Sequence, residues 1–135
     1  MIALHTAGLL IVQDRKLLLA YSKNKQCFYL PGGKIDAGES AKEALCREIA
    51  EELNVYLQKE DLRYYTHISA VAFGELDGIM MEQECFFADK EVNPQTFGEI
   101  GELKYFSLSE YVEQEPTAPG AVSILEKLKT DGYID

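Results

Sequence analysis

Three glutamates stand close together in one short segment of this chain: Glu48, Glu51 and Glu52. In a helix, residues three and four positions apart are neighbours, so the spacing would crowd the three carboxylates together. Such like charges repel one another, and a bound divalent cation is the simplest way to offset the repulsion. A site made of carboxylate oxygens favours a hard ion such as Mg²⁺ or Mn²⁺ over zinc.

The segment that carries these glutamates is predicted to be a helix. Ser40 and Glu43 have the spacing of a capping box, so the helix should begin there. Asn54 tolerates the left-handed backbone conformation that ends helices, so the helix should stop near Leu53. Apolar residues at helical spacing form the stripe that should face the core, at Ala41, Leu45, Ile49 and Leu53.

The predicted helix turns two of its glutamates towards the protein body. Around the helix axis, Glu52 lies about 20° from Leu45 and Glu48 about 60° from it. Glu51 lies further round, at about 120°. Glutamates beside a buried stripe should sit at the edge of the body, in a cleft. Arg47 precedes Glu51 by four residues and can hold that carboxylate by a charged hydrogen bond.

A solvated acidic face is the plain alternative for such a helix, and the preceding loop argues against it. Pro31, Gly32, Gly33 and Gly38 break regular structure and let the backbone turn tightly and approach a ligand closely. The loop also brings Glu39 to the start of the helix, and its backbone carbonyls can complete the coordination shell of a cation. Loop and helix together therefore predict a cation site.

The loop and helix resemble the signature of the Nudix hydrolases, with the box over residues 33–55. That signature reads Gly, five residues, Glu, seven residues, Arg-Glu, an aliphatic residue, any residue, Glu-Glu, any residue, Gly and an aliphatic residue. The sequence matches it at Gly33, Glu39, Arg47, Glu48, Ile49, Glu51, Glu52 and Val55. Asn54 stands where the family has glycine, and Asn is the next best residue for a left-handed helix end. The run PGGKIDAGES also resembles the loop of MutT-like members.

The resemblance implies a fold, a cofactor and a set of site residues. The fold would be α+β, an α/β/α sandwich with a mixed central sheet and a loop-helix-loop catalytic motif. The cofactor would be Mg²⁺, for which Mn²⁺ can substitute. Arg47 and Glu39 would orient the metal ligands. Those ligands would be three carboxylates and one backbone carbonyl, from Glu48, Glu51, Glu52 and Gly32.

Family members also use a glutamate outside the box, just before a late strand. The segment EIGELKYF resembles that region, and either Glu99 or Glu102 can fill the role, as a metal ligand or as a base. Glu48 is the first choice for the general base by similarity to MutT-like members, and the late-strand glutamate is the second. Lys23 and Lys34 are candidates for contacting substrate phosphates.

The rest of the chain is expected to complete one domain over residues 1–135. The hydrophobic patterns predict strands at 3–13, 16–21, 62–73, 79–88 and 102–106. The two long strands should form a hairpin across residues 75–78. Ser107 or Ser109 should cap a short helix through Tyr111, and Pro119 should lie in the first turn of a final helix.

Charge and composition restrict the partners. The net charge of −10 disfavours nucleic acid polymers, although carboxylates can still bind phosphorylated small molecules through divalent cations. The start of the chain lacks a signal-peptide pattern, and no apolar run is long enough for a membrane span, so a cytoplasmic monomer or homodimer is expected. Cys27, Cys46 and Cys85 lack zinc or redox spacing and should be free, mostly buried thiols.

The resulting hypothesis is a Mg²⁺-dependent hydrolase that cleaves a diphosphate bond in a small nucleotide, and the expected substrate is a normal or modified nucleoside triphosphate. Markers of other Nudix groups are missing. Ala70 stands where ADP-ribose enzymes commonly have proline, Val71 and Ala72 stand where diadenosine polyphosphate enzymes commonly have tyrosine, and there is no tryptophan. A nucleotide-sugar or ADP-ribose pyrophosphatase is the alternative. A non-catalytic nucleotide-sensing domain is a weaker alternative, because such domains usually lack one or more of the signature carboxylates. An acidic calcium-binding domain is weaker still, because it would not need the glycine loop.

Overall fold

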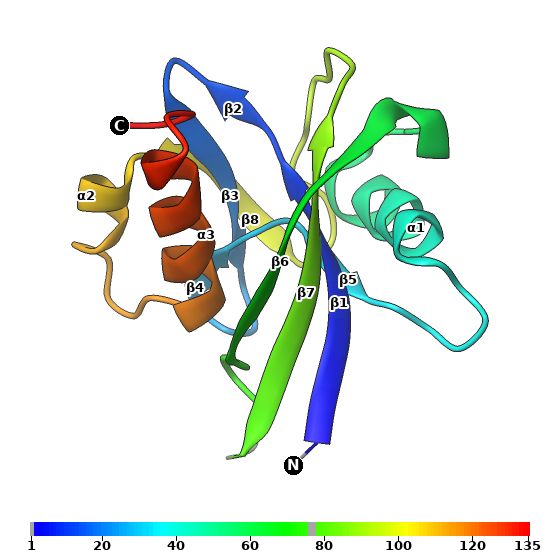
Figure 1. Ribbon diagram of the computed structural model, residues 1–135, viewed down its shortest axis with the longest axis horizontal. Helices are drawn as coiled ribbons and strands as arrows, with labels where there is room; N and C mark the ends of the chain where they lie inside the picture. The colour runs from blue at the N-terminus through cyan, green and yellow to red at the C-terminus, as the bar shows by residue number, and fades with distance from the viewer. Residues whose placement is uncertain (1, 76–77) are drawn as a thin grey trace.

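The computed structural model of the protein describes residues 2–75 and 78–135 (Figure 1). Its strands are β1 (Ile2–Leu10), β2 (Val12–Gln13), β3 (Lys16–Ser22), β4 (Cys27–Tyr29), β5 (Gly32–Lys34), β6 (Leu62–Val71), β7 (Ile79–Ala88) and β8 (Ile100–Phe106). Its helices are α1 (Ala41–Leu53), α2 (Leu108–Tyr111) and α3 (Pro119–Thr130), with a single 3₁₀ turn, η1 (Lys59–Asp61).

The strands form two sheets. The first has the order β5-β1-β7-β6, and it is mixed because β1 runs parallel to β7 while the other pairs are antiparallel. In the second sheet, β3 pairs antiparallel with β2, β4 and β8. The parallel pairing of β1 with β7 places distant parts of the chain side by side, with Thr6 opposite Gln83.

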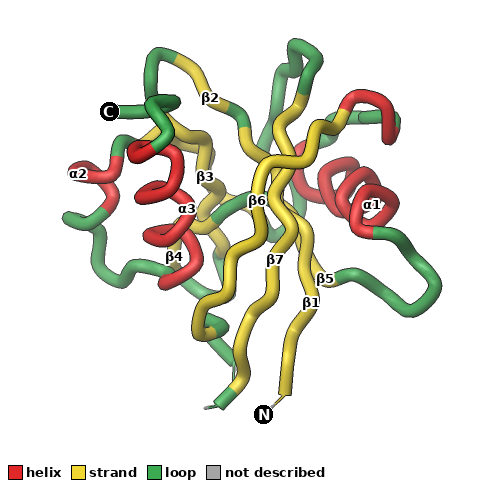
Figure 2. The backbone as a smooth tube through the Cα atoms, in the orientation of Figure 1, coloured by secondary structure: helices red, strands yellow, loops and turns green. Residues whose placement is uncertain are grey.

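Helices cover the sheets from two sides, as Figures 1 and 2 show. Helix α1 packs on one side through Leu45, Ile49 and Leu53, which join Leu9 and Phe86 in one core cluster. Helices α2 and α3 close a larger core on the other side, among the strands of both sheets. This arrangement confirms the α/β/α sandwich with a mixed sheet.

The strand expected over residues 3–13 is divided at Ile11. Its first part, β1, belongs to the first sheet, and its second part, β2, pairs with β3 in the other sheet. The uninterrupted apolar run conceals this change of partner. The segment expected as pure loop from Pro31 also differs, because Gly32 and Gly33 form part of β5 and pair with β1.

The other elements lie close to their predicted positions. Strand β6 ends at Val71, two residues early, and β8 starts at Ile100, two residues early. Of the expected hairpin turn, residues 76 and 77 lie outside the described part. Ser107, rather than Ser109, caps α2 by accepting a hydrogen bond from Glu110 N–H. The predicted Pro119 in the first turn of α3 is confirmed.

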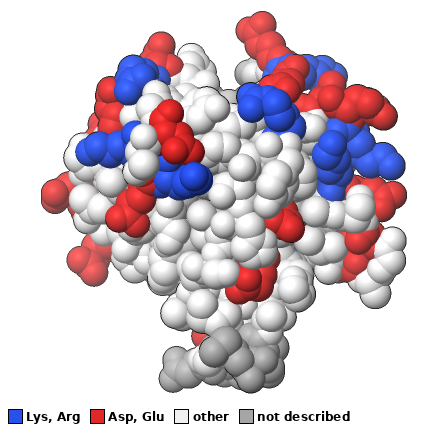
Figure 3. Space-filling model, viewed as in Figure 1, with Lys and Arg blue, Asp and Glu red and all other residues white. Residues whose placement is uncertain are grey.

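Charged side chains gather mainly around the helices. In the view of Figure 3, acidic and basic groups are intermingled there, and the centre of the visible face is largely uncharged. No broad basic surface appears on this face. Within the described residues, the structure contains no helix with the length and apolar character of a membrane span.

Candidate active site

Helix α1 has the predicted ends. The Ser40 hydroxyl accepts from Glu43 N–H at 3.1 Å, and Ser40 N–H donates to the Glu43 carboxylate at 2.8 Å, which completes the capping box. Asn54 ends the helix in the left-handed conformation, with φ of 55°. Asn54 therefore adopts the conformation for which the Nudix signature has glycine.

Gly32 and Gly33, the two glycines of β5, lie where a side chain would meet neighbouring atoms. At Gly32, where φ is 142°, a Cβ atom would strike the backbone of β1 at Ala7. At Gly33, a Cβ atom would strike the carboxyl group of Glu48. A side chain at position 32 would therefore collide with backbone, whereas at position 33 the Glu48 side chain, one of the predicted ligands, would have to move.

Glu52 is the most enclosed of the three glutamates. Its carboxylate accepts from Gly32 N–H at 3.0 Å and from the Tyr29 hydroxyl at 3.3 Å. Burial raises the pKa of Glu52 to about 7; the Gly32 hydrogen bond opposes this rise, and the negative charge of Glu48 adds to it. An ionised Glu52 thus lies in a place that favours an added positive charge.

Arg47 ties the loop to the helix. Its guanidinium donates to both carboxylate oxygens of Glu39, at 2.8 and 2.9 Å, and to Glu48 at 2.9 Å. It also donates to the carbonyl of Lys34 at 3.1 Å. The hydrogen bonds from Arg47 to Glu39, together with the one from Asp36 N–H, lower the pKa of Glu39 to about 2, so that it stays ionised.

Arg47 has a different main partner from the one expected at helical spacing. Its guanidinium lies 3.7 Å from Glu51, whose side chain is 60% exposed. The stronger contacts go to Glu39 and Glu48, whose side chains are 22% and 19% exposed. The predicted orientation around α1 is otherwise observed, with Glu48 and Glu52 towards the body and Glu51 outside.

These residues border a cleft of about 410 Å³. The cleft contains Glu48 and Glu52 together with Gly32 and Gly33. Among residues 2–75 and 78–135, no three acidic, histidine or cysteine side chains already converge as a ready metal cage. The site nevertheless suits Mg²⁺ or Mn²⁺, because its donors are all oxygens and Glu52 is buried beside like charges.

Two candidate glutamates, Glu99 and Glu102, lie outside the box. Glu99 accepts from the hydroxyl of Ser22 at 3.3 Å. Burial and Glu52, with a smaller effect of Glu99, raise the pKa of Tyr29, which lines the cleft, whereas Glu99 and Glu102 are both absent from its lining residues. Glu102 is exposed and lies opposite Tyr21 in the second sheet. Both glutamates therefore stay candidates for the late-strand role.

Of the two lysines that were candidates for binding phosphate, only one lines the cleft. Lys34 lines the cleft. Lys23 instead donates to the carbonyl of Gly98 at 3.2 Å, and it is absent from the residues that line the cleft. Lys25 lines the cleft and was missed, because a lysine in a turn after a strand carries no distinguishing signal. Tyr29 also lines the cleft and was missed, because an aromatic residue in a short apolar strand is typical of a core position.

The family follows from a comparison with known proteins. Residues 3–128 match the family model of the NUDIX domain, so the chain belongs to the Nudix family. It is 29% identical over 117 residues to an uncharacterized Nudix hydrolase, YvcI, of Bacillus subtilis. That match covers 84% of this chain and 71% of the relative.

Two further relatives match over shorter segments. An ADP-ribose pyrophosphatase of Methanocaldococcus jannaschii is 50% identical over 46 residues, and a protein of Bacillus subtilis provisionally named 8-oxo-dGTP diphosphatase is 40% identical over 52. The matches cover 32% and 36% of this chain. The chain spans only 27% and 35% of the lengths of these two relatives.

Solved structures agree on the fold. A MutT Nudix hydrolase from Burkholderia pseudomallei superposes with a TM-score of 0.76 at 25% identity, covering 95% of this chain and 99% of the other. A bifunctional NMN adenylyltransferase/ADP-ribose pyrophosphatase from Francisella tularensis, complexed with AMP and a manganese ion, gives 0.68 at 20% identity. That match covers 96% of this chain and 42% of the other.

Proposed function

We propose that this protein hydrolyses a diphosphate bond in a normal or modified nucleoside triphosphate, with Mg²⁺ as its cofactor. The observation that carries the proposal is the pair of partly buried carboxylates, Glu48 and Glu52, held against the glycine backbone in one cleft. A nucleotide-sensing domain without activity would not need this arrangement. Family members act with a divalent metal, as the manganese in the Francisella tularensis structure illustrates.

The residues that would hold Mg²⁺ are Glu48 and Glu52, with the carbonyl of Gly32 and with Glu51 at the outer edge. When bound, the cation neutralises diphosphate oxygens and lowers the pKa of water. Arg47 fixes one oxygen of Glu48 by its hydrogen bond and leaves the other facing the loop. We assign to that carboxylate the acceptance of the proton from the attacking water.

Positive charge beside the carboxylates supports a role in binding phosphate. Lys25 and Lys34 both line the cleft, and each adds a cation to a border that otherwise carries several carboxylates. Lysine binds phosphate oxygens as a point charge. We therefore assign the substrate phosphates to the part of the cleft between these lysines and the two enclosed glutamates.

The substrate class is the finer part of the proposal. The provisional name of one relative, 8-oxo-dGTP diphosphatase, supports a modified triphosphate, and the missing markers at Ala70, Val71 and Ala72 support it too. The name of another relative, ADP-ribose pyrophosphatase, keeps that alternative open. Both names belong to proteins that this chain matches over short segments.

A substrate panel tests the proposal. The protein would be incubated with Mg²⁺ and with common and oxidised deoxynucleoside triphosphates, ADP-ribose and a nucleotide sugar, and the products would be read by mass. Glu126→Gln is a matched control for variants of the site, because Glu126 is exposed on α3. A tenfold or greater preference for ADP-ribose or the sugar would refute the substrate class. Absence of hydrolysis across the panel would refute the function.

A further inference from the structure

The first sheet buries two polar side chains where apolar residues would be cheaper. Thr6 on β1 lies opposite Gln83 on β7, and each is 6% exposed. In the part of the chain that the structure describes, the hydroxyl of Thr6 is the one buried side-chain polar atom without a hydrogen-bond partner. Gln83 has a weak contact, from Cys85 Sγ at 3.8 Å. Poorly paired buried polar groups cost free energy, which points to a role other than stability.

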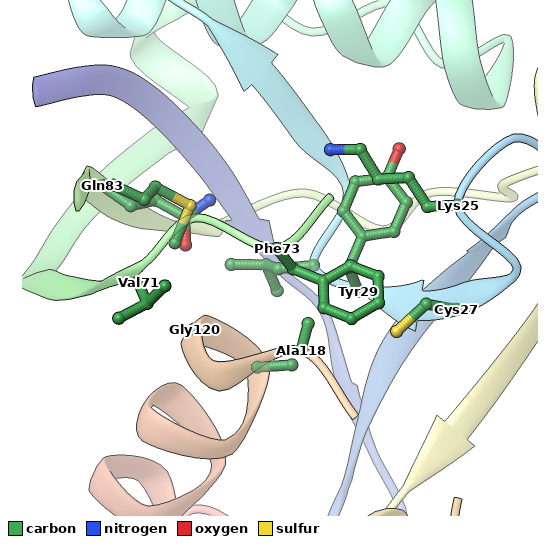
Figure 4. Close-up of a pocket in the computed structure, with 11 residues that line it drawn as sticks. Lys25, Cys27, Tyr29, Val71, Phe73, Gln83, Ala118 and Gly120 are labelled. Atoms are coloured by element: carbon green, nitrogen blue, oxygen red, sulfur yellow. The ribbon is translucent and has the colours of Figure 1, made fainter. Parts of the chain in front are cut away.

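Both side chains border empty space next to the carboxylates. Thr6 and Gln83 line the same cleft as Glu48 and Glu52. Gln83 also lines an adjoining pocket with mostly apolar walls. Figure 4 shows Gln83 on one side of this pocket and the aromatic side chains of Tyr29 and Phe73 on the other.

The carboxamide of Gln83 lies next to Gly8 of β1. A Cβ atom at Gly8 would come within 3.1 Å of both Cδ and Nε2 of Gln83, and it would collide with the side chain of Leu30. Because Gly8 has no side chain, the carboxamide has room beside the backbone of β1.

We infer that Gln83 and Thr6 recognise the hydrogen-bonding edge of a nucleobase seated where the cleft meets the adjoining pocket, because Gln83 lines both and Thr6 lines the cleft. A carboxamide presents a donor and an acceptor side by side, which matches the adjacent donor and acceptor of a base edge. Aromatic walls suit a planar ring. The inference rests on the proposed function, because it places the base beside the cleft where the diphosphate would lie.

Gln83→Met tests the inference by binding alone. Methionine is similar in volume and removes both hydrogen-bonding groups. Calorimetry with the common nucleoside monophosphates, in chelator, should show at least about tenfold weaker binding of the preferred nucleotide. Gln58→Met is the matched control, since Gln58 is exposed outside the cleft, and it should bind like the wild type. Equal affinities for Gln83→Met, or no binding by the wild type, would overturn the inference.

Thr6→Val separates recognition from a structural role. Valine keeps the shape and removes the unpaired hydroxyl, so the free energy of unfolding should stay equal or rise while nucleotide affinity falls severalfold. A parallel loss of stability and affinity, or no change in affinity, would refute the role of Thr6. Because these measurements use monophosphates, they stand apart from hydrolysis. A panel without turnover would refute the proposed function and leave base recognition intact.

Discussion

Replacing Glu52 with glutamine should remove activity and stabilise the metal-free protein. Burial raises the pKa of Glu52 from its ordinary value of 4.5 to about 7. Each tenfold change in proton affinity corresponds to roughly 1.4 kcal/mol, so the ionised carboxylate costs the folded state about 3 kcal/mol. Glutamine avoids this cost and keeps an oxygen that can accept from Gly32 N–H. The kcat of the Glu52→Gln variant should fall by roughly 10²-fold or more.

The pH dependence follows from the sign of this change. The folded state binds the proton of Glu52 more tightly than the unfolded state does, so the stability that Glu52 contributes is lost as pH rises from about 4.5 to about 7. In chelator, Glu52→Gln should therefore match the wild type near pH 4.5 and exceed it by up to about 3 kcal/mol at pH 8.

Chemical denaturation at several pH values measures this difference. Saturating Mg²⁺ should reduce or reverse it, because a ligand that binds only the folded state stabilises the wild type. Glu126→Gln, on the exposed surface of α3, controls for loss of a surface charge. A difference in stability that stays constant with pH, or a folded Glu52→Gln protein with normal turnover, would refute the assignment of Glu52.

Further predictions concern the metal, the loop and the helix end. Chelator should abolish hydrolysis, and added Mg²⁺ or Mn²⁺ should restore it; product release in excess chelator would contradict a metal role. Arg47→Lys should lower kcat/KM roughly 10- to 100-fold, because lysine cannot hold Glu39 by two hydrogen bonds and Glu48 as well; unchanged kinetics would show that this orientation is dispensable. Gly33→Ala should reduce metal affinity, measured by calorimetry, since its Cβ would displace the Glu48 carboxyl group; normal affinity would show that the loop yields easily. Asn54→Gly should leave kcat/KM nearly unchanged because Asn54 already has a left-handed backbone; a tenfold gain would mean that Asn54 limits activity.

Local patterns were sufficient to predict the centre of the site. The limits of α1 depend on the Ser40 capping box and on the tolerance of Asn54 for positive φ, and both effects act over a few residues. The position of Glu48 and Glu52 beside the buried stripe follows from helix geometry alone. Even the steric need for glycine at position 33 is local, since the nearby α1 carries the carboxyl group that would be struck.

Contacts between distant segments could not be predicted in the same way. The division of the first strand at Ile11 depends on two different pairings, because β1 pairs with β7 in one sheet and β2 pairs with β3 in the other. The surroundings of Glu99 depend on where β8 meets β3 and the loop after it, because Glu99 accepts from Ser22, and both glutamates precede similar apolar residues. Helical spacing suggested Glu51 as the partner of Arg47, yet the incoming loop supplied Glu39, which is fixed by two hydrogen bonds.

The same reasoning separates chemistry from specificity in this fold. The residues assigned to the metal come from one continuous loop and helix, so a short motif can encode them. The residues inferred to bind the base, Thr6 and Gln83, are 77 positions apart and meet only because β1 pairs parallel to β7. Substitutions on these strands can therefore change the ligand while the carboxylates of α1 stay in place. Such an arrangement allows closely matching signatures to occur in proteins with different substrates.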